Sequence, residues 1–149
     1  MTLISQHIDL PVTPAEAYDY VSRPLRWKEW HASSLAVQEI GDESLVAGRR
    51  FEEDVRAAGR LRHLTWLVEE SRPGERWRAS AYMDDGSTVR LCYAFEAAPG
   101  GTRFTRTLDY VLAPRLLRLL NDLFLRRRVA AESARALARL QARLSRAEG

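Results

Sequence analysis

The chain has 149 residues, of which 46% are hydrophobic and 29% charged, and this length predicts one globular domain over residues 1–149. The single cysteine, Cys92, excludes an intramolecular disulfide and a zinc site built on cysteines. No apolar run approaches the roughly 18 residues of a membrane span, and the N-terminus lacks the pattern of a secretory signal. We therefore expect a cytoplasmic protein without stable membrane insertion.

The formal net charge is +3, and of the 23 basic residues only Lys28 is a lysine. Because 20 acidic residues are interleaved with them, the composition does not favour a polyanion as partner, and we expect no nucleic acid. The three histidines, His7, His31 and His63, do not share the spacing of metal ligands. The sequence also lacks a phosphate-binding glycine loop and a nucleophile motif. We predict neither a metal site nor a cofactor.

The N-terminal part predicts a strand followed by short helices. Residues 3–10 alternate between apolar and polar side chains, which is typical of a half-buried strand. Thr13 and Pro14 suit the cap and the first position of a helix. Pro24 ends this helix near Ser22, and we expect a second short helix with two tryptophans to follow.

The remainder predicts a meander of strands and one long helix. From about residue 34 to residue 112, turn residues divide the chain into six strands. From Pro114 to about Ala147, leucines recur at helical spacing. This helix is the only element able to cover one face of the sheet. The predicted fold class is α+β, with a curved seven-stranded antiparallel sheet around a C-terminal helix. The turns are Gly41-Asp42, Ala58-Gly59, Arg72-Pro73-Gly74, Asp85-Gly86 and Pro99-Gly100-Gly101.

This order of elements and several local motifs resemble the START-like superfamily, also called SRPBCC, in its polyketide cyclase/dehydrase branch. The resemblance spans essentially the whole chain. It implies a helix-grip fold with a cavity for a hydrophobic small molecule between sheet and helix. It does not imply one reaction, because members include binders, transporters and enzymes. The matching segments are Val12-Thr13-Pro14-Ala15-Glu16 with Tyr18 and Val21, Arg23-Pro24 through Trp30, Trp66-Leu67-Val68-Glu69-Glu70, Tyr93-Ala94-Phe95-Glu96 and Gly100-Gly101-Thr102-Arg103-Phe104-Thr105.

Strand alternation and loop length predict which residues face each other across four hairpins. In the third hairpin, a two-residue Asp85-Gly86 loop would place Tyr82 beside Val89. We prefer a three-residue loop that places Ala81 there, because it keeps the apolar face continuous. The predicted pairs are Phe51 with Trp66, Glu53 with Leu64, Val55 with Arg62, Trp66 with Ala81, Val68 with Ala79, Glu70 with Trp77, Ala81 with Val89, Trp77 with Tyr93, Val89 with Tyr110, Leu91 with Leu108, Tyr93 with Arg106 and Phe95 with Phe104.

All four hairpins agree on one apolar face, which three charged residues interrupt: Glu53, Arg62 and Arg106. A buried charge is costly unless it is paired or functional. Arg106 is therefore predicted to anchor a ligand carbonyl or carboxylate, and Glu53 to act as a general base or ligand acceptor. Alternatively, both arginines lie at the cavity rim or pair with Glu53 and only hold the shape of the sheet.

The middle of the C-terminal helix carries the small residues Ala130, Ser133 and Ala134 between large leucines. Placed over Ala79 and Ala81, they leave unfilled volume, which predicts a cavity of ligand size. Alternatively, the large aromatic side chains of the sheet fill this space. The predicted ligand contacts are Phe51, Arg62, Leu64, Trp66, Trp77, Ala79, Ala81, Leu91, Tyr93, Phe104, Leu108, Leu123, Arg127, Ala130 and Ala134.

Three functions stay open. The first is a binder of a lipid, polyketide or quinone-like molecule. The second is a polyketide aromatase/cyclase in which Glu53 is the catalytic base and Arg106 or Tyr110 stabilises an enolate. The third is a docking module, because the leucine-rich helix start is followed by Arg126, Arg127 and Arg128, a pattern suited to a lipid surface. The same leucines suit packing under the sheet edge or a homodimer contact.

Overall fold

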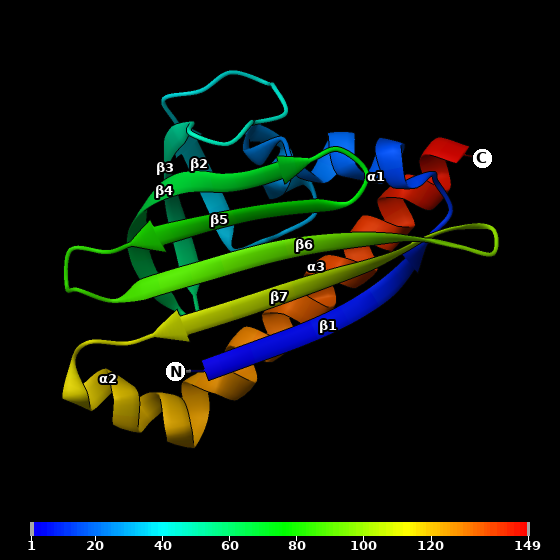
Figure 1. Ribbon diagram of the computed structural model, residues 1–149. Helices are drawn as coiled ribbons and strands as arrows, with labels where there is room; N and C mark the ends of the chain where they lie inside the picture. Colours follow the sequence, from blue (N-terminus) through cyan, green and yellow to red (C-terminus); the bar gives the residue numbers. More distant parts are fainter. Residues whose placement is uncertain (1, 149) are drawn as a thin grey trace.

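The computed structural model describes residues 2–148, in which seven strands, two short N-terminal helices and a C-terminal helical region follow one another (Figure 1). The elements are β1 (Thr2–Leu10), α1 (Pro14–Val21), the 3-10 helix η1 (Pro24–Glu29), β2 (Ser34–Gln38), β3 (Arg50–Ala57), β4 (Arg60–Arg72), β5 (Arg76–Tyr82), β6 (Thr88–Ala98), β7 (Gly101–Val111), α2 (Arg115–Leu120), the π-helical turn η2 (Asn121–Leu125) and α3 (Arg126–Glu148).

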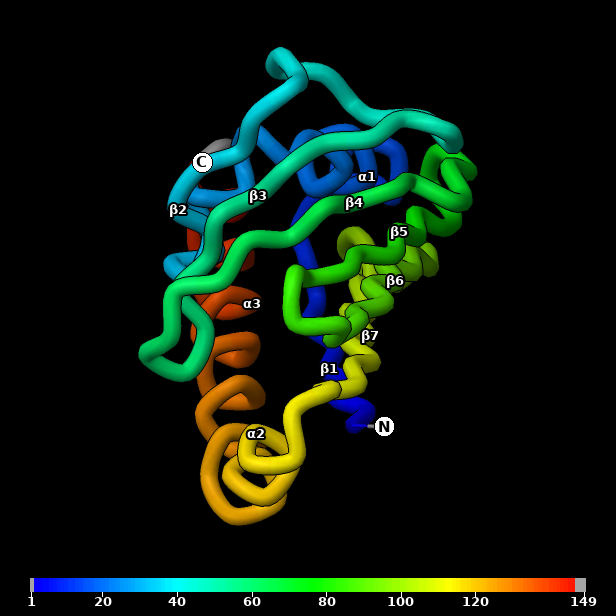
Figure 2. Tube along the Cα trace, turned by 90° about the vertical axis from the view of Figure 1, so that its left-hand side faces the viewer, coloured from blue at the N-terminus to red at the C-terminus, as the bar shows by residue number. Residues whose placement is uncertain are grey.

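The strands form one antiparallel sheet in the order β1-β7-β6-β5-β4-β3-β2. The sheet curves around α3, which crosses its concave face (Figures 1 and 2). Leu137, Leu140 and Leu144 of α3 are buried against this face. Side-chain alternation along each strand leaves the opposite face to charged and hydroxyl side chains. The architecture confirms the predicted helix-grip fold.

The pairing of the hairpins matches the predicted register at every pair but one. Ala81 pairs with Val89, so the three-residue loop at the third hairpin is confirmed. The exception is Trp77, which pairs with Ser71 and not with Glu70, because a β-bulge shifts the register between Val68 and Glu70. The extra residue of a bulge leaves no mark in the alternation that precedes it.

The short N-terminal helices close one end of the curved sheet. Thr13 caps α1 by accepting the backbone N–H of Glu16 at 3.2 Å. In η1, Trp27 is almost fully buried and donates its indole N–H to the carbonyl oxygen of Val21 at 2.7 Å. Its ring meets four sheet aromatics edge-on, at centroid distances between 5.6 and 6.3 Å. These aromatics are Phe51, Trp66, Trp77 and Tyr93.

The C-terminal region is helical from Arg115 to Glu148, close to the predicted bounds, but the π turn η2 interrupts its regular α-helical pattern. The π turn η2 holds one residue more than an α-helical turn. The residues that face the sheet before this turn and those that face it after the turn therefore do not follow one regular helical spacing. Leu117 and Asn121 face inward and are buried, whereas Leu123, a predicted ligand contact, is 53% exposed and Leu116 is 66% exposed. Leucine periodicity alone gave the wrong face here.

Candidate functional site

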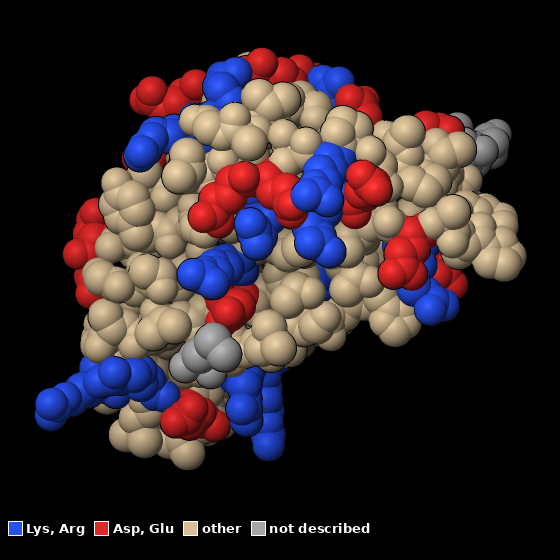
Figure 3. Space-filling model, viewed as in Figure 1, with Lys and Arg blue, Asp and Glu red and all other residues tan. Residues whose placement is uncertain are grey.

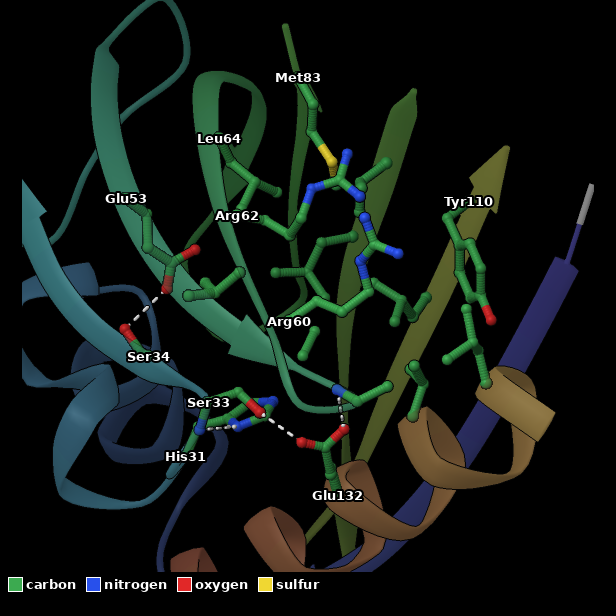
Figure 4. A pocket seen from close by; sticks show the side chains of 18 of the residues that line it. His31, Ser33, Ser34, Glu53, Arg60, Arg62, Leu64, Met83, Tyr110 and Glu132 are labelled. Atoms are coloured by element: carbon green, nitrogen blue, oxygen red, sulfur yellow. Dashed lines mark hydrogen bonds between the residues drawn. The ribbon is translucent and has the colours of Figure 1, made fainter. Parts of the chain in front are cut away.

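A cavity of about 160 Å³ lies between the concave face of the sheet and the helical region (Figure 4). An engineered apolar cavity of about 150 Å³ holds benzene, so this space suits a ring-sized group. The exposed Arg60 and the half-buried Met83 lie on one side of it, where longer molecules could extend outward. Its walls comprise Trp27, His31, Ser33, Ser34, Glu53, Val55, Ala57, Ala58, Arg60, Arg62, Leu64, Trp66, Met83, Val89, Leu91, Tyr93, Arg106, Leu108, Tyr110, Leu112, Leu117, Asn121, Leu125, Val129 and Glu132.

Glu53 is a buried carboxyl group in the cavity wall, with 4% of its surface exposed. The hydroxyl of Ser34 donates to its Oε2 at 2.7 Å, and the indole N–H of Trp66 donates to its Oε1 at 3.0 Å. Burial raises the pKa of Glu53 to about 7, against the opposing effects of these two donors and of the Arg106 charge. The group therefore exchanges its proton near neutral pH.

Arg106 enters the same wall from β7 and is 7% exposed. Its Nη1 donates to Ser133 Oγ at 2.8 Å, and its Nη2 lies 3.3 Å from His31 Nε2. Its Nε has no hydrogen-bond partner among the described residues. A guanidinium has five N–H donors, and of these the Nε–H is left without an acceptor on the protein.

His31 is held neutral beside this guanidinium. Burial lowers the pKa of His31 to about 3, and the charges of Arg106 and Arg139 add to the effect. The backbone N–H of Ser33 lies 3.3 Å from His31 Nδ1. Because a neutral imidazole has one acceptor nitrogen, the ring accepts from Ser33 or from Arg106, but not from both at once.

Tyr110 is tied to the π turn at the helical wall. Its hydroxyl donates to Asn121 Oδ1 at 2.5 Å, and Asn121 Nδ2 donates to Thr2 Oγ1 at 2.8 Å. Asn121 is buried, with 4% of its surface exposed. The Tyr110 proton is therefore already committed to a protein acceptor.

Arg62 pairs with Asp85 of the β5–β6 loop, and this ion pair is partly exposed. It does not pair with Glu53, which corrects one of the alternatives for the charged residues. Surface ion pairs of this kind contribute little to stability. Arg62 and Arg60 lie together near Met83 in Figure 4, away from the Glu53 and Ser34 pair.

The predicted site residues divide into three groups. Nine line the cavity, and sheet alternation thus located part of its wall: Glu53, Arg62, Leu64, Trp66, Leu91, Tyr93, Arg106, Leu108 and Tyr110. Six are buried or half-buried outside its walls: Phe51, Trp77, Ala79, Ala81, Phe104 and Ala130. The remaining three are exposed and lie outside the walls: Leu123, Arg127 and Ala134.

The sequence analysis missed wall residues that come from irregular or helical segments. His31, Ser33 and Ser34 precede or begin the edge strand β2, where no alternation marks them. Glu132 binds across to the β3–β4 hairpin, since its Oε1 accepts the backbone N–H of Ala58 at 2.7 Å. An acidic residue on an arginine-rich helix gives no such signal. Within residues 2–148, no group of three or more His, Cys, Asp or Glu side chains is arranged to hold a metal ion.

Comparison with known proteins agrees with this architecture. A family model described as "Polyketide cyclase / dehydrase and lipid transport" matches residues 1–145. The crystal structure of TTHA0849 from Thermus thermophilus is similar over 99% of this chain and 100% of its own, with a TM-score of 0.81 and 17% identity. A protein from Rhodobacter sphaeroides is similar over 97% of this chain and 92% of its own, with a TM-score of 0.71 and 21% identity. No curated protein sequence matches.

Proposed function

This chain belongs to the polyketide cyclase/dehydrase and lipid transport family, and from that premise we propose that it binds a hydrophobic small molecule in the cavity beneath its helical region. The observation that carries the proposal is a mainly apolar cavity whose wall holds a buried guanidinium, that of Arg106, with its Nε–H left without an acceptor. Burial of ligand surface in the apolar walls contributes about 25 cal/mol per Å². Arg106 then selects the end of the ligand that carries an oxygen acceptor.

An empty cavity of this kind lowers the stability of the folded chain in two ways. Packed interiors do not keep open spaces of this size without a use. A buried donor without a partner costs about 1–3 kcal/mol, and the Nε of Arg106 is one. A lipid, polyketide or quinone-like molecule with a carbonyl or carboxylate group removes both costs.

The test measures whether a fluorescent fatty acid, cis-parinaric acid, enters the cavity. Leu108→Trp should fill the cavity and weaken binding at least about tenfold. Val111→Trp is the matched control, because Val111 lies on the same strand but is 43% exposed and outside the cavity walls. Arg106→Leu should weaken parinaric acid more than the corresponding alcohol. Equal binding by wild type and Leu108→Trp, with both folded, would refute the proposal.

A second candidate function is proton transfer by Glu53, which the environment of its carboxyl group favours. A general base works best when its pKa is near the working pH, and burial raises the pKa of Glu53 to about 7. In an aromatase/cyclase, Glu53 would remove a proton next to a carbonyl whose oxygen Arg106 stabilises. Tyr110 is less suited to that role, since its hydroxyl already donates a hydrogen bond to Asn121 Oδ1.

Hydrogen exchange at the α-carbon of α-tetralone, followed by NMR in deuterated water, tests this candidate. The wild type should accelerate the exchange, and Glu53→Gln should abolish the acceleration. Glu75→Gln, which removes an exposed carboxylate in the β4–β5 turn, should leave it unchanged. Exchange no faster than in buffer would eliminate proton abstraction from this ketone.

A third candidate is contact with an anionic lipid surface through the exposed side of α2 and η2. Leu116, Leu119, Leu123 and Phe124 are between 53% and 66% exposed there. Arg115, Arg118 and Arg126 to Arg128 surround them, with Asp122 as the one acid of residues 111–128. Figure 3 shows basic side chains on two sides of this end of the molecule, with an acidic side chain between them. A symmetric dimer through this side would bring the same arginines together, which disfavours a second copy.

Vesicle sedimentation tests this contact. Binding to vesicles of phosphatidylcholine with phosphatidylglycerol should fall in Leu119→Ser/Leu123→Ser and persist in Leu35→Ser/Leu61→Ser, where the lost leucines are exposed elsewhere. Equal binding to phosphatidylcholine alone would contradict a role for the arginines. A wild-type dimer that the first variant dissociates would instead assign this side to a second copy. No helix within residues 2–148 is long and apolar enough to cross a membrane.

A further inference from the structure

A second hollow, of about 230 Å³, lies on the outer side of the wall that His31, Ser33 and Glu132 form. It is bounded by the β3–β4 hairpin and by α3, and among the α3 residues that line it are those at positions 128, 135 and 139. Positions 128 and 135 are two helical turns apart, and positions 135 and 139 are one turn apart, so the three side chains lie on the same side of the helix. All three are arginines, and a fourth, Arg56, enters from the end of β3.

The positive charge of this hollow is not neutralised within the protein. Arg56, Arg128, Arg135 and Arg139 are exposed, and none forms an ion pair with a carboxylate among the described residues. Glu132 is the only acid in its walls. Its two oxygens accept from Ser33 Oγ at 3.2 Å and from the backbone N–H of Ala58 at 2.7 Å. The walls therefore present four guanidinium groups and one carboxylate that already has two donors.

A buried donor in the same walls independently indicates a missing acceptor. Trp30 lines the hollow and is fully buried, and its indole Nε1–H has no partner among the described residues. By contrast, the indole N–H groups of Trp27, Trp66 and Trp77 all have acceptors on the protein. The pKa of His31, in the shared wall, is held low by burial and by the charges of Arg106 and Arg139, which agrees with a positive potential at this place.

We propose that the hollow formed by Trp30, Arg56, Arg128, Arg135 and Arg139 binds a phosphate group. Guanidinium groups form paired, charge-assisted hydrogen bonds to phosphate oxygens. A phosphate monoester offers enough oxygens to meet several of these arginines together. The phosphate can come from inorganic phosphate or from the head of an amphiphile whose chain enters the neighbouring cavity. The site itself does not depend on what the cavity binds.

The experiment titrates the full chain with inorganic phosphate and with dodecyl phosphate, following the indole N–H signals by two-dimensional NMR. The Trp30 signal should move, whereas that of Trp27, which is bonded to Val21, should not. Arg135→Gln/Arg139→Gln should weaken phosphate at least about tenfold. Arg78→Gln/Arg90→Gln removes the same charge from exposed positions on the outer sheet face and should change affinity less than about twofold.

Two results support the site and distinguish the source of the phosphate. Much tighter binding of dodecyl phosphate than of both inorganic phosphate and dodecanol assigns the hollow to the head of an amphiphile. Equal affinity for the two phosphates assigns it to the free anion. If both double variants weaken binding equally, or if the chemical shift of the Trp30 indole does not change at saturation, phosphate binds through nonspecific electrostatic attraction. Either result overturns the proposal. A failure here leaves the parinaric acid result intact.

Discussion

Replacing Glu53 by glutamine should change how stability depends on pH, because this carboxyl group is far easier to protonate in the folded chain. Burial raises the pKa of Glu53 from 4.5 to about 7. The folded state therefore binds a proton that the unfolded state has released between these values. The contribution of protonated Glu53 to the free energy of unfolding is fully present below pH 4.5 and is lost as pH rises through 7. The full loss is about 3 kcal/mol, of which roughly 2–3 kcal/mol falls between about pH 5 and pH 8.

Urea unfolding of wild type and Glu53→Gln at about pH 5 and pH 8 measures this loss directly. Glutamine has nearly the same shape and does not titrate, so the variant should gain roughly 2–3 kcal/mol relative to wild type at the higher pH. Other titrating groups are common to both proteins and cancel in the difference. Glu75→Gln is the control, and its stability relative to wild type should not change with pH in this way. A difference that shrinks or reverses at the higher pH would show that Glu53 is ionised and stabilised by Arg106.

Three further predictions concern stability and are checked by the same urea unfolding. Trp27→Ala should lose about 3–5 kcal/mol, because it empties the centre of the aromatic cluster. Gly101→Ala should lose roughly 3 kcal/mol or more, because a Cβ atom there would lie 1.9 Å from the carbonyl oxygen of Leu10, and near-normal stability would disprove this contact. Asn121→Leu should lose about 1–3 kcal/mol by stranding the hydroxyl of Tyr110, and adding Tyr110→Phe should restore part of the loss.

The sheet could be predicted from the sequence because its information is local. Period-two alternation and short loops determine the register, and they are enough to place Glu53 and Arg106 on the concave face. The bulge near Glu70 was missed because an inserted residue leaves each half of the strand with normal alternation.

The helical wall and the polar end of the cavity could not be predicted in the same way. The spacing of the leucines on α2 is that of residues packed in a core, and only the π turn explains why several of them are exposed. Asn121 lies inside because two long-range partners, Tyr110 and Thr2, hold it there. His31 and Glu132 join the site through the fold and not through any pattern around them. Contacts of this kind depend on which distant segments meet, which periodicity does not encode.

Because of the π turn, the number of residues in this segment determines which side chains of α2 line the cavity. Each residue of an α-helix advances the chain by about 100° around the axis. A chain one residue shorter between Asn121 and Leu125 would form an uninterrupted helix, but α2 would then be rotated by about that angle against α3. Asn121 would leave the wall, and a side chain from the solvent side would replace it. A single codon deletion here would thus turn α2 by a little more than a quarter turn and change which of its side chains line the cavity, while every strand kept its place.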